Sequence, residues 1–288
     1  MAVPHRIALA VMLAALAAPT ISSQQPHSVP SPDSAHSSPA AIVDPRAAQP
    51  ERPTVATHAY TVAPGYVEIE AGVQEARPQG ASQFVAPVVA KLGITPRLQL
   101  ELQGGYENYG VPGHAGSANT GVTDLAVALK QRVLRAAPVL HDFSIQAALK
   151  FPSGARGVGT GTTDLSLVLI SSRPIGAAEL DLNAGYTHRS GDGTSIPTSA
   201  TLLTASFGTP IHGPVSGVAE LFTFPRTGGP AGAPTVVGFI IGPTLQLMPS
   251  LVLDAGAILN VAHMGANAAY LGVTYNAGRI PGFPPPHR

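Results

Sequence analysis

The chain has 288 residues with equal numbers of acidic and basic side chains, and only 11% of its residues are charged. Soluble domains carry roughly 25%, so this composition is unusual for a soluble protein. The zero net charge gives no indication of a nucleic-acid partner. The absence of cysteine excludes disulfides, a lipoprotein anchor and cysteine-based zinc or redox chemistry.

The N-terminus is typical of a secretory signal peptide over residues 1–23. His5 and Arg6 supply a short positive region, and an apolar run at 7–18 follows that is too short to span a bilayer. The sequence Ala15-Leu16-Ala17 offers a cleavage site between small residues. The alternative is a buried strand or helix of the mature fold.

Residues 24–59 have a different composition, rich in Ser, Pro, Ala and Gln. Such a segment buries too little apolar area to offset the entropy of ordering it. We therefore expect a disordered, Pro- and Ser-rich periplasmic leader in front of the folded domain.

From residue 60 onward, apolar and polar residues alternate, most clearly at 98–103, 164–169 and 179–184. A period of two places alternate side chains on opposite faces of a β-strand. Runs of this kind, separated by Gly, Pro, Asn and Asp, predict twelve strands, each long enough to cross a membrane when tilted. The predicted strands are 64–74, 82–93, 97–108, 121–134, 141–151, 162–172, 178–189, 198–208, 214–225, 234–246, 250–261 and 268–279.

The connections alternate between compact turns and longer, Gly-rich loops. Outer-membrane barrels have short periplasmic turns and longer outer loops. The sequence therefore predicts an all-β fold, an antiparallel up-and-down transmembrane β-barrel of about 12 strands, over residues 60–283. Both termini lie on the short-turn side, and residues 284–288 form a C-terminal tail. A secreted, soluble β-sandwich that binds a ligand is the alternative.

If the apolar faces contact lipid, the alternating polar residues line the lumen, and acidic residues outnumber basic ones among them. The lumen-lining candidates are Glu101, Asp124, Lys130, Arg132, Lys150, Asp164, Glu179 and Asp181. Centring one turn near residue 137 and the next near 157 pairs Asp124 with Lys150, Lys130 with Ser144, Arg132 with Asp142, and Lys150 with Asp164. Lys150 should then lie between two aspartates at the outer mouth, either as a constriction or as a structural network of paired charges.

The sequence carries no sign of catalysis or of a bound cofactor. It contains neither a Gly-x-Ser-x-Gly elbow nor a P-loop, and no two histidines have the His-x-x-x-His spacing. His114, His188 and His263 fall in or beside predicted outer loops, where solvated side chains are the default expectation. We predict neither an enzyme, nor a metal site, nor a cofactor.

Four motifs in order resemble a known family. Residues 119–125 (Asn-Thr-Gly-Val-Thr-Asp-Leu) precede 147–154, which end Lys-Phe-Pro-Ser-Gly; a second Gly-rich Asp strand at 159–165 and Leu-Asp-Leu-Asn-Ala-Gly-Tyr at 180–186 follow. This order resembles the outer-membrane barrel family named for the meta-pathway of phenol degradation, over about 60–283. Phe151 and Ser153 stand where that family usually has Leu and Thr. The resemblance implies a channel or transporter for small, often aromatic or hydrophobic compounds.

The leading hypothesis is therefore a channel in the outer membrane of a Gram-negative cell, through which small solutes diffuse along a polar lumen. Its expected partners are the lipid bilayer, small-molecule solutes and the outer-membrane assembly machinery. The main alternative is a structural or surface-interaction barrel whose lumen is filled.

Overall fold

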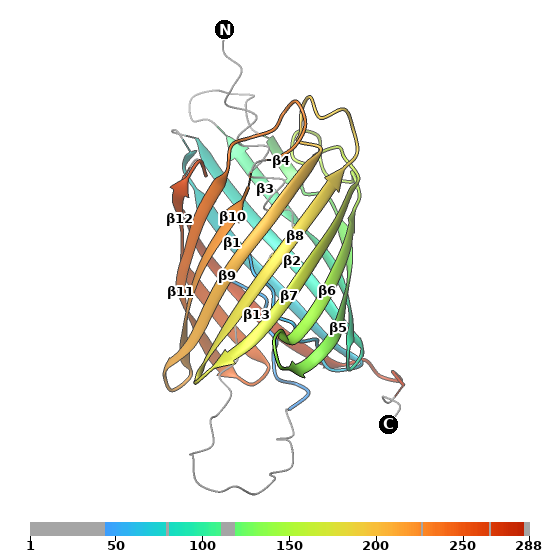
Figure 1. Ribbon diagram of the computed structural model, residues 1–288, viewed down its shortest axis with the longest axis vertical. Helices are drawn as coiled ribbons and strands as arrows, with labels where there is room; N and C mark the ends of the chain where they lie inside the picture. Colours follow the sequence, from blue (N-terminus) through green and yellow to red (C-terminus); the bar gives the residue numbers. More distant parts are fainter. Residues whose placement is uncertain (1–43, 79–80, 111–118, 226, 265, 285–288) are drawn as a thin grey trace, which may run out of the picture.

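A computed structural model describes residues 44–284 except 79–80, 111–118, 226 and 265; the predicted signal peptide and most of the predicted tail lie outside these residues. The described chain forms a tall antiparallel β-barrel with strongly tilted strands (Figure 1). Its strands are β1 (Tyr66–Ala76), β2 (Ser82–Thr95), β3 (Leu98–Gly110), β4 (Asn119–Val122), β5 (Ala126–Ala137), β6 (His141–Lys150), β7 (Asp164–Ile175), β8 (Ala178–Arg189), β9 (Ser199–His212), β10 (Val215–Phe224), β11 (Val236–Met248), β12 (Leu251–Ala262) and β13 (Ala268–Arg279).

The barrel is closed, because each strand except β4 pairs with a strand on both sides, and β1 pairs with β13. The short strand β4 and the longer strand β5 both pair with β3, so together they occupy one position in the wall. The wall therefore has twelve positions, and each of the twelve predicted strands coincides with one of them. Among the described strands, only β4 is paired along a single edge; the others have both edges paired, as a bilayer requires.

The predicted strand at 121–134 is broken where Asp124 leaves the ladder. Its carboxylate accepts hydrogen bonds from the backbone N–H groups of Gly154 and Thr160, each at 2.8 Å. These bonds turn residues 123–125 toward the loop between β6 and β7. Side-chain hydrogen bonding thus replaces strand pairing over three residues.

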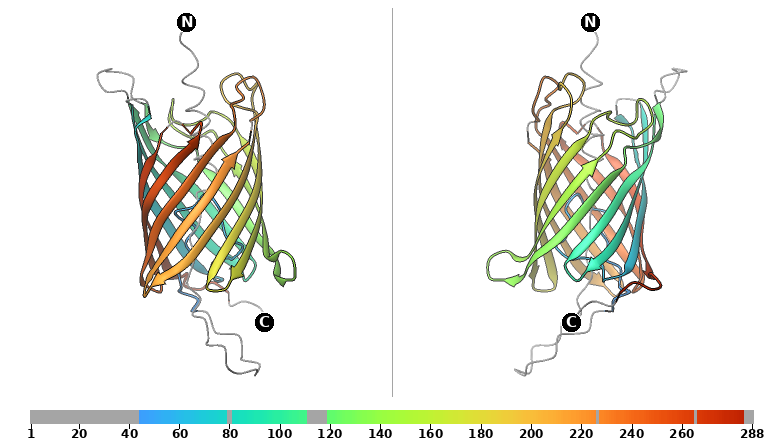
Figure 2. Two further views of the ribbon diagram at one scale, coloured as in Figure 1. Left: turned by 60° about the vertical axis from the view of Figure 1, so that its left-hand side comes forward. Right: turned by 90° about the vertical axis from the view of Figure 1, so that its right-hand side faces the viewer.

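The two ends of the barrel differ as the sequence predicts. Compact turns join β2 to β3, β5 to β6, β7 to β8, β9 to β10 and β11 to β12 at one end, where the wall also begins and ends at Tyr66 and Arg279. Longer connections lie at the opposite end, and the views in Figure 2 show both ends around the barrel. We call these the short-turn end and the loop end.

The outward face is apolar and the inward face is mostly polar. Outward side chains that are 41–60% exposed include Ile69, Leu102, Leu167, Leu182, Leu203, Leu221, Ile241 and Leu271. Their neighbours in sequence are buried inside the barrel. A ring of exposed apolar side chains around a closed barrel matches the lipid-facing band of an outer-membrane protein. None of the described residues belongs to a helix long and apolar enough to cross a membrane.

Candidate functional site: the barrel interior

Residues 44–64, which we call the plug and which are blue in Figure 1, begin at the short-turn end with the exposed Arg46 and lie inside the barrel from Ala47 onward. Ala48, Ala56, Thr57, Ala59 and Val62 have no exposed surface. The expectation of a disordered leader is therefore wrong for residues 44–59, while residues 24–43 lie outside the described part of the chain. The plug has little apolar surface of its own, so its order must come from polar contacts with the wall.

Backbone groups of the plug make most of these contacts. The N–H groups of Val55 and Ala56 both donate to the Glu220 carboxylate at 2.6 Å. Further N–H donations run from Gln49 to Glu68, Glu51 to Glu70, Thr57 to Asn183, Ala59 to Ser172 and Val62 to Gln99. Wall side chains thus act as acceptors for an extended peptide, which satisfies buried donors without a β-ladder.

Two adjacent residues of opposite charge, Glu51 and Arg52, attach the middle of the plug to charged side chains of the wall. The Glu51 carboxylate pairs with Lys130 and lies 3.5 Å from Lys91 Nζ. Arg52 Nε lies 3.6 Å from the Asp254 carboxylate on β12. All of these side chains are at least 90% buried, so each charge depends on its partner for compensation.

A group of buried charges on β1 and β2 surrounds the Glu51 contact. Lys91 Nζ lies 3.2 Å from Glu68 and 2.5 Å from Glu70, and it also donates to the Gln49 carbonyl at 3.0 Å. Lys91 has no exposed side-chain surface. One ammonium group therefore serves two wall carboxylates and the plug at once.

Five of the predicted lumen candidates lie in this polar interior. Glu101 accepts hydrogen bonds from three amides, those of Gln99, Gln103 and Gln146, at 2.8–2.9 Å. Lys130 forms an ion pair with Glu51, and Arg132 forms one with Asp142. Asp181 accepts a hydrogen bond from the Ser172 hydroxyl. Glu179 is buried beside Tyr60.

Lys150 lies between Asp124 and Asp164 at the loop end, as the sequence predicts. Its Nζ is 2.7 Å from Asp124 and 3.5 Å from Asp164, and Arg189 joins Asp164 at 3.2 Å. Burial tends to raise the Asp124 pKa, but hydrogen bonds from Lys150, Thr160 and Gly154 outweigh it and leave the pKa below its usual value. These contacts hold the loop 151–163 against the wall, which favours the structural network over a constriction.

The predicted register is right between β6 and β7 and wrong between β5 and β6. Lys150 is opposite Asp164 as predicted. Across β5 and β6, however, Lys150 is opposite Ala126, with Lys130 opposite Gln146 and Arg132 opposite Ser144. Irregular pairing near the turn moves the register by two residues. A two-residue shift keeps every side chain on its predicted face, so the ion pairs to Asp124 and Asp142 still form.

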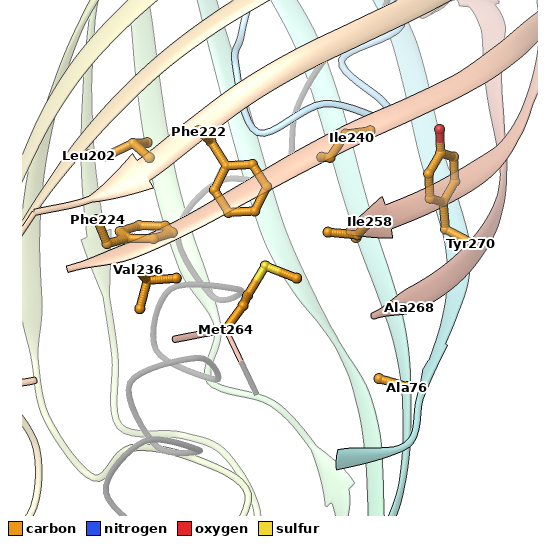
Figure 3. Packing of buried hydrophobic residues seen from close by; sticks show 10 residues of the cluster. All are labelled: Ala76, Leu202, Phe222, Phe224, Val236, Ile240, Ile258, Met264, Ala268 and Tyr270. Carbon is orange, nitrogen blue, oxygen red and sulfur yellow. The ribbon is translucent and has the colours of Figure 1, made fainter. Parts of the chain in front are cut away.

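In the half of β9–β13 nearest the loop end, the side chains that face the interior are apolar, which the sequence analysis did not predict. Figure 3 shows these side chains gathered along the strands that lead to the loop end. The polar lumen expected from the sequence is therefore wrong for this part of the interior. We call this cluster the apolar wall; it consists of Ala76, Leu202, Phe222, Phe224, Val236, Ile240, Ile258, Met264, Ala268 and Tyr270, with Val55 of the plug packed against it.

One signal in the sequence could have revealed the apolar wall. Residues 236–241 read Val-Val-Gly-Phe-Ile-Ile, and Leu202-Leu203 and Ile258-Leu259 are adjacent apolar pairs. Where alternation is lost in this way, both faces of a strand are apolar. In the plug, the adjacent charges Glu51 and Arg52 stand out against a background of Ala, Pro and Thr.

A cavity of about 480 Å³ opens at the short-turn end between the plug and the wall. Tyr60, Val62, Arg132, His141 and Glu179 are among the residues that line it. The Arg132 guanidinium lies 5.0 Å from the centre of the Tyr60 ring, a distance typical of a cation–π contact. The plug thus does not fill the interior completely.

The described residues contain no cluster of three His, Asp or Glu side chains that could hold a metal ion. His188 and His263 are exposed, and His263 Nδ1 lies 2.9 Å from the Thr235 carbonyl. His114 lies outside the described residues.

A closed twelve-position barrel with an apolar outer face and a largely polar interior defines a β-barrel of the outer-membrane type. The COG4313 outer membrane channel from Pseudomonas putida F1 has this fold, with a TM-score of 0.60 and 13% identity over 75% of this chain and 97% of that chain. Two further barrels are less similar. The KdgM porin in complex with disordered oligogalacturonate has a TM-score of 0.48 and 10% identity over 72% of this chain and 98% of that chain. The translocator domain of the autotransporter NalP from Neisseria meningitidis has a TM-score of 0.44 and 12% identity over 73% of this chain and 88% of that chain.

The chain belongs to the family described as "Putative MetA-pathway of phenol degradation", whose sequence profile matches residues 51–274. The match confirms the resemblance stated from the motifs. It also begins at Glu51, within the plug. No curated protein matches the sequence.

Proposed function

We propose that this protein is an outer-membrane channel through which small solutes, including aromatic and hydrophobic ones, diffuse passively. The fold shared with an outer-membrane channel supports the channel role, and the family description supports aromatic solutes. The observation that carries the solute class is the apolar wall, which turns Phe222, Ile240 and Tyr270 inward near the loop end.

An apolar inner wall is unfavourable in a pore that passes only water and ions, because its hydration costs free energy. It is useful to a hydrophobic solute, which leaves water when it contacts the wall. Phe222 and Phe224 also form an edge-to-face pair, with ring centres 6.1 Å apart and planes at 74°. Such a surface suits flat, ring-shaped solutes.

The proposed transport needs no bond making, since diffusion requires only a path and a gradient. The acidic side chains of the interior outnumber the basic ones. We therefore propose that the path admits water-soluble cations in preference to anions.

The plug favours a second candidate, a structural barrel with a filled lumen. Its backbone groups and its two charged residues occupy the centre of the barrel. In a barrel of this kind the apolar wall would only hold the plug in place, and neither ions nor solutes would pass.

Uptake of a hydrophobic fluorophore by intact Gram-negative cells separates the two candidates. The lipopolysaccharide layer slows entry of N-phenylnaphthylamine, so a channel that accepts such a ring compound should speed its fluorescence rise. Removing one Phe contact costs about 1.5–3 kcal/mol, so Phe222→Gln should reduce the channel-dependent rate by about tenfold.

The matched control is Ser166→Gln, which places the same side chain on β7, on the polar side of the interior. It should leave the fluorophore uptake unchanged. Equal uptake by cells with and without the protein would contradict the channel for hydrophobic solutes. Equal loss in both variants would contradict the role of the apolar wall.

A further inference from the structure

We propose that the plug is a reversible gate and that Arg52 is its latch. This inference rests on the proposed channel function, because a gate has meaning only where solutes pass. In the conformation described above the gate is closed, and solutes pass when residues 44–64 withdraw toward the short-turn end.

The first argument is topological. The wall closes through the pairing of β2 with β3 and of β1 with β13, and the plug ends before β1 begins at Tyr66. Withdrawal of the plug therefore breaks no hydrogen bond between wall strands. The barrel can remain closed as a wall while its lumen opens.

The second argument is that the plug enters and leaves at the same end. Ala48 N–H donates to the Pro249 carbonyl in the turn between β11 and β12, at 2.8 Å. Pro64 bridges to Gly93, and Gly65 N–H donates to the Gly93 carbonyl at 2.7 Å, near the turn between β2 and β3. Both turns lie at the short-turn end, so the intervening loop can withdraw without being threaded through the barrel.

The third argument is the shape of the Arg52 site, which we call the glycine notch. Gly72 of β1 is opposite Gly272 of β13, and Gly272 is opposite Asp254 of β12. A Cβ atom at either glycine would collide with the Arg52 guanidinium. Three neighbouring strands therefore provide one flat, side-chain-free recess that ends in a carboxylate, which fits the planar cation of the plug.

The latch holds the plug loosely enough to release it. The closest charged contact, Arg52 Nε to Asp254, is 3.6 Å long, and Arg52 Nη2 donates to the Leu271 carbonyl at 3.4 Å. Among the described residues, neither Arg52 Nε nor Asp254 Oδ1 has a hydrogen-bond partner. A buried pair with such geometry repays little of its desolvation penalty, and water would solvate the wall carboxylates once the plug leaves.

A reversible cross-link tests the gate in the full-length protein. The chain has no cysteine, so Ala59→Cys with Ser172→Cys introduces a single pair at a contact of 2.7 Å between Ala59 N and Ser172 Oγ. In planar bilayers we expect the oxidised protein to show no openings and the reduced protein to recover the wild-type conductance. Gel mobility with and without reductant reports the cross-link.

Latch variants provide the opposite test. Arg52→Ala and Gly272→Ala should each raise the open probability by about tenfold or more, because either change breaks the buried contact. Arg46→Ala is the matched control: Arg46 belongs to the plug, but its side chain is 71% exposed and pairs with Asp44 outside the barrel lumen. Heat-modifiable mobility in detergent shows that each variant forms a barrel.

The outcomes separate the gate from the channel. Equal conductance in the oxidised and reduced states would overturn the gate and leave the channel standing. An Arg46→Ala effect as large as that of Arg52→Ala would overturn the latch. No conductance in the wild type, the reduced protein and the folded latch variants would overturn the channel and the gate together.

Discussion

The inward faces of β5–β8 and of the loop-end half of β9–β13 arise from the same type of strand but differ in chemistry: the first is mostly polar, although Val168 and Ile170 of β7 pack on Ala59 of the plug, and the second is apolar. Along β5–β8 the buried positions hold Lys130, Gln146, Lys150 and Asp181, each with a partner. Along β9–β13 the corresponding positions near the loop end hold Leu202, Phe222, Ile240 and Ile258, which pack on one another.

The difference teaches that alternation defines two faces of a strand and does not define the polarity of the inner one. A polar side needs a partner for every buried group, so its residues form a network that orders the plug and the loops. An apolar side needs no such partners, and under the proposed function it is the side that receives a solute. We therefore assign order to one side of the interior and passage to the other.

The largest expected effect is at Lys91 of β2, in the polar interior that continues from β5–β8 to β1 and β2. Lys91→Met leaves Glu68, Glu70 and Glu51 without their shared cation, and breaking a buried ion pair costs about 3–5 kcal/mol. The temperature at which the barrel loses its compact mobility in detergent should fall sharply. Arg77→Met is the control, since Arg77 is 80% exposed and pairs with Glu75 at the surface, where a pair is worth about 0–1 kcal/mol. Similar shifts for both variants would refute the distinction.

A smaller effect is expected on the apolar side, at Ile240. Ile240→Ala removes a buried side chain, and such changes cost about 2–5 kcal/mol in tightly packed cores. We expect the lower end of that range, because the wall faces a lumen that can adapt. The adjacent residue Ile241 points outward and is 48% exposed, so Ile241→Ala should cost less. A larger loss at Ile241 than at Ile240, measured by urea titration in micelles, would contradict the assigned faces.

The smallest effect is expected at the rim of the polar side, at Lys150. Lys150→Met removes the cation that joins Asp124 to Asp164, so the loop 151–163 should open more often while the barrel stays intact. Trypsin cleavage at Arg156, an exposed residue of that loop, reports this opening. A loss of about 1.4 kcal/mol corresponds to tenfold faster cleavage. Cleavage at Arg97, which is exposed in the turn between β2 and β3, should not change, and unchanged cleavage at Arg156 would contradict the role of Lys150.

The wall was predictable from the sequence because a lipid-facing strand must be apolar at every second residue. The same period placed Lys150 between Asp124 and Asp164, since a register error of two residues leaves the faces unchanged. The break at Asp124 was not predictable, because it depends on the loop 151–163, whose backbone N–H groups donate hydrogen bonds to that carboxylate.

The plug was not predictable for a different reason. Its contacts use backbone N–H groups and wall side chains, which leave no periodic pattern in residues 44–64. Only Glu51 and Arg52 carry a specific signal, and the glycine notch that receives Arg52 is spread over three strands. The apolar wall likewise becomes a surface only when the outer halves of five strands are brought together.

Photolabelling with an aromatic diazirine tests most directly whether the apolar side is the one that receives solutes. The full-length protein in lipid bilayers is labelled with and without excess toluene, and the modified residues are located by mass spectrometry. We predict that toluene suppresses labelling at Phe222, Ile240 and Tyr270 and leaves labelling of the outward residues Leu221 and Ile241 unchanged. Suppression confined to the inward residues of β5–β8, or no suppression inside the barrel, would contradict the account.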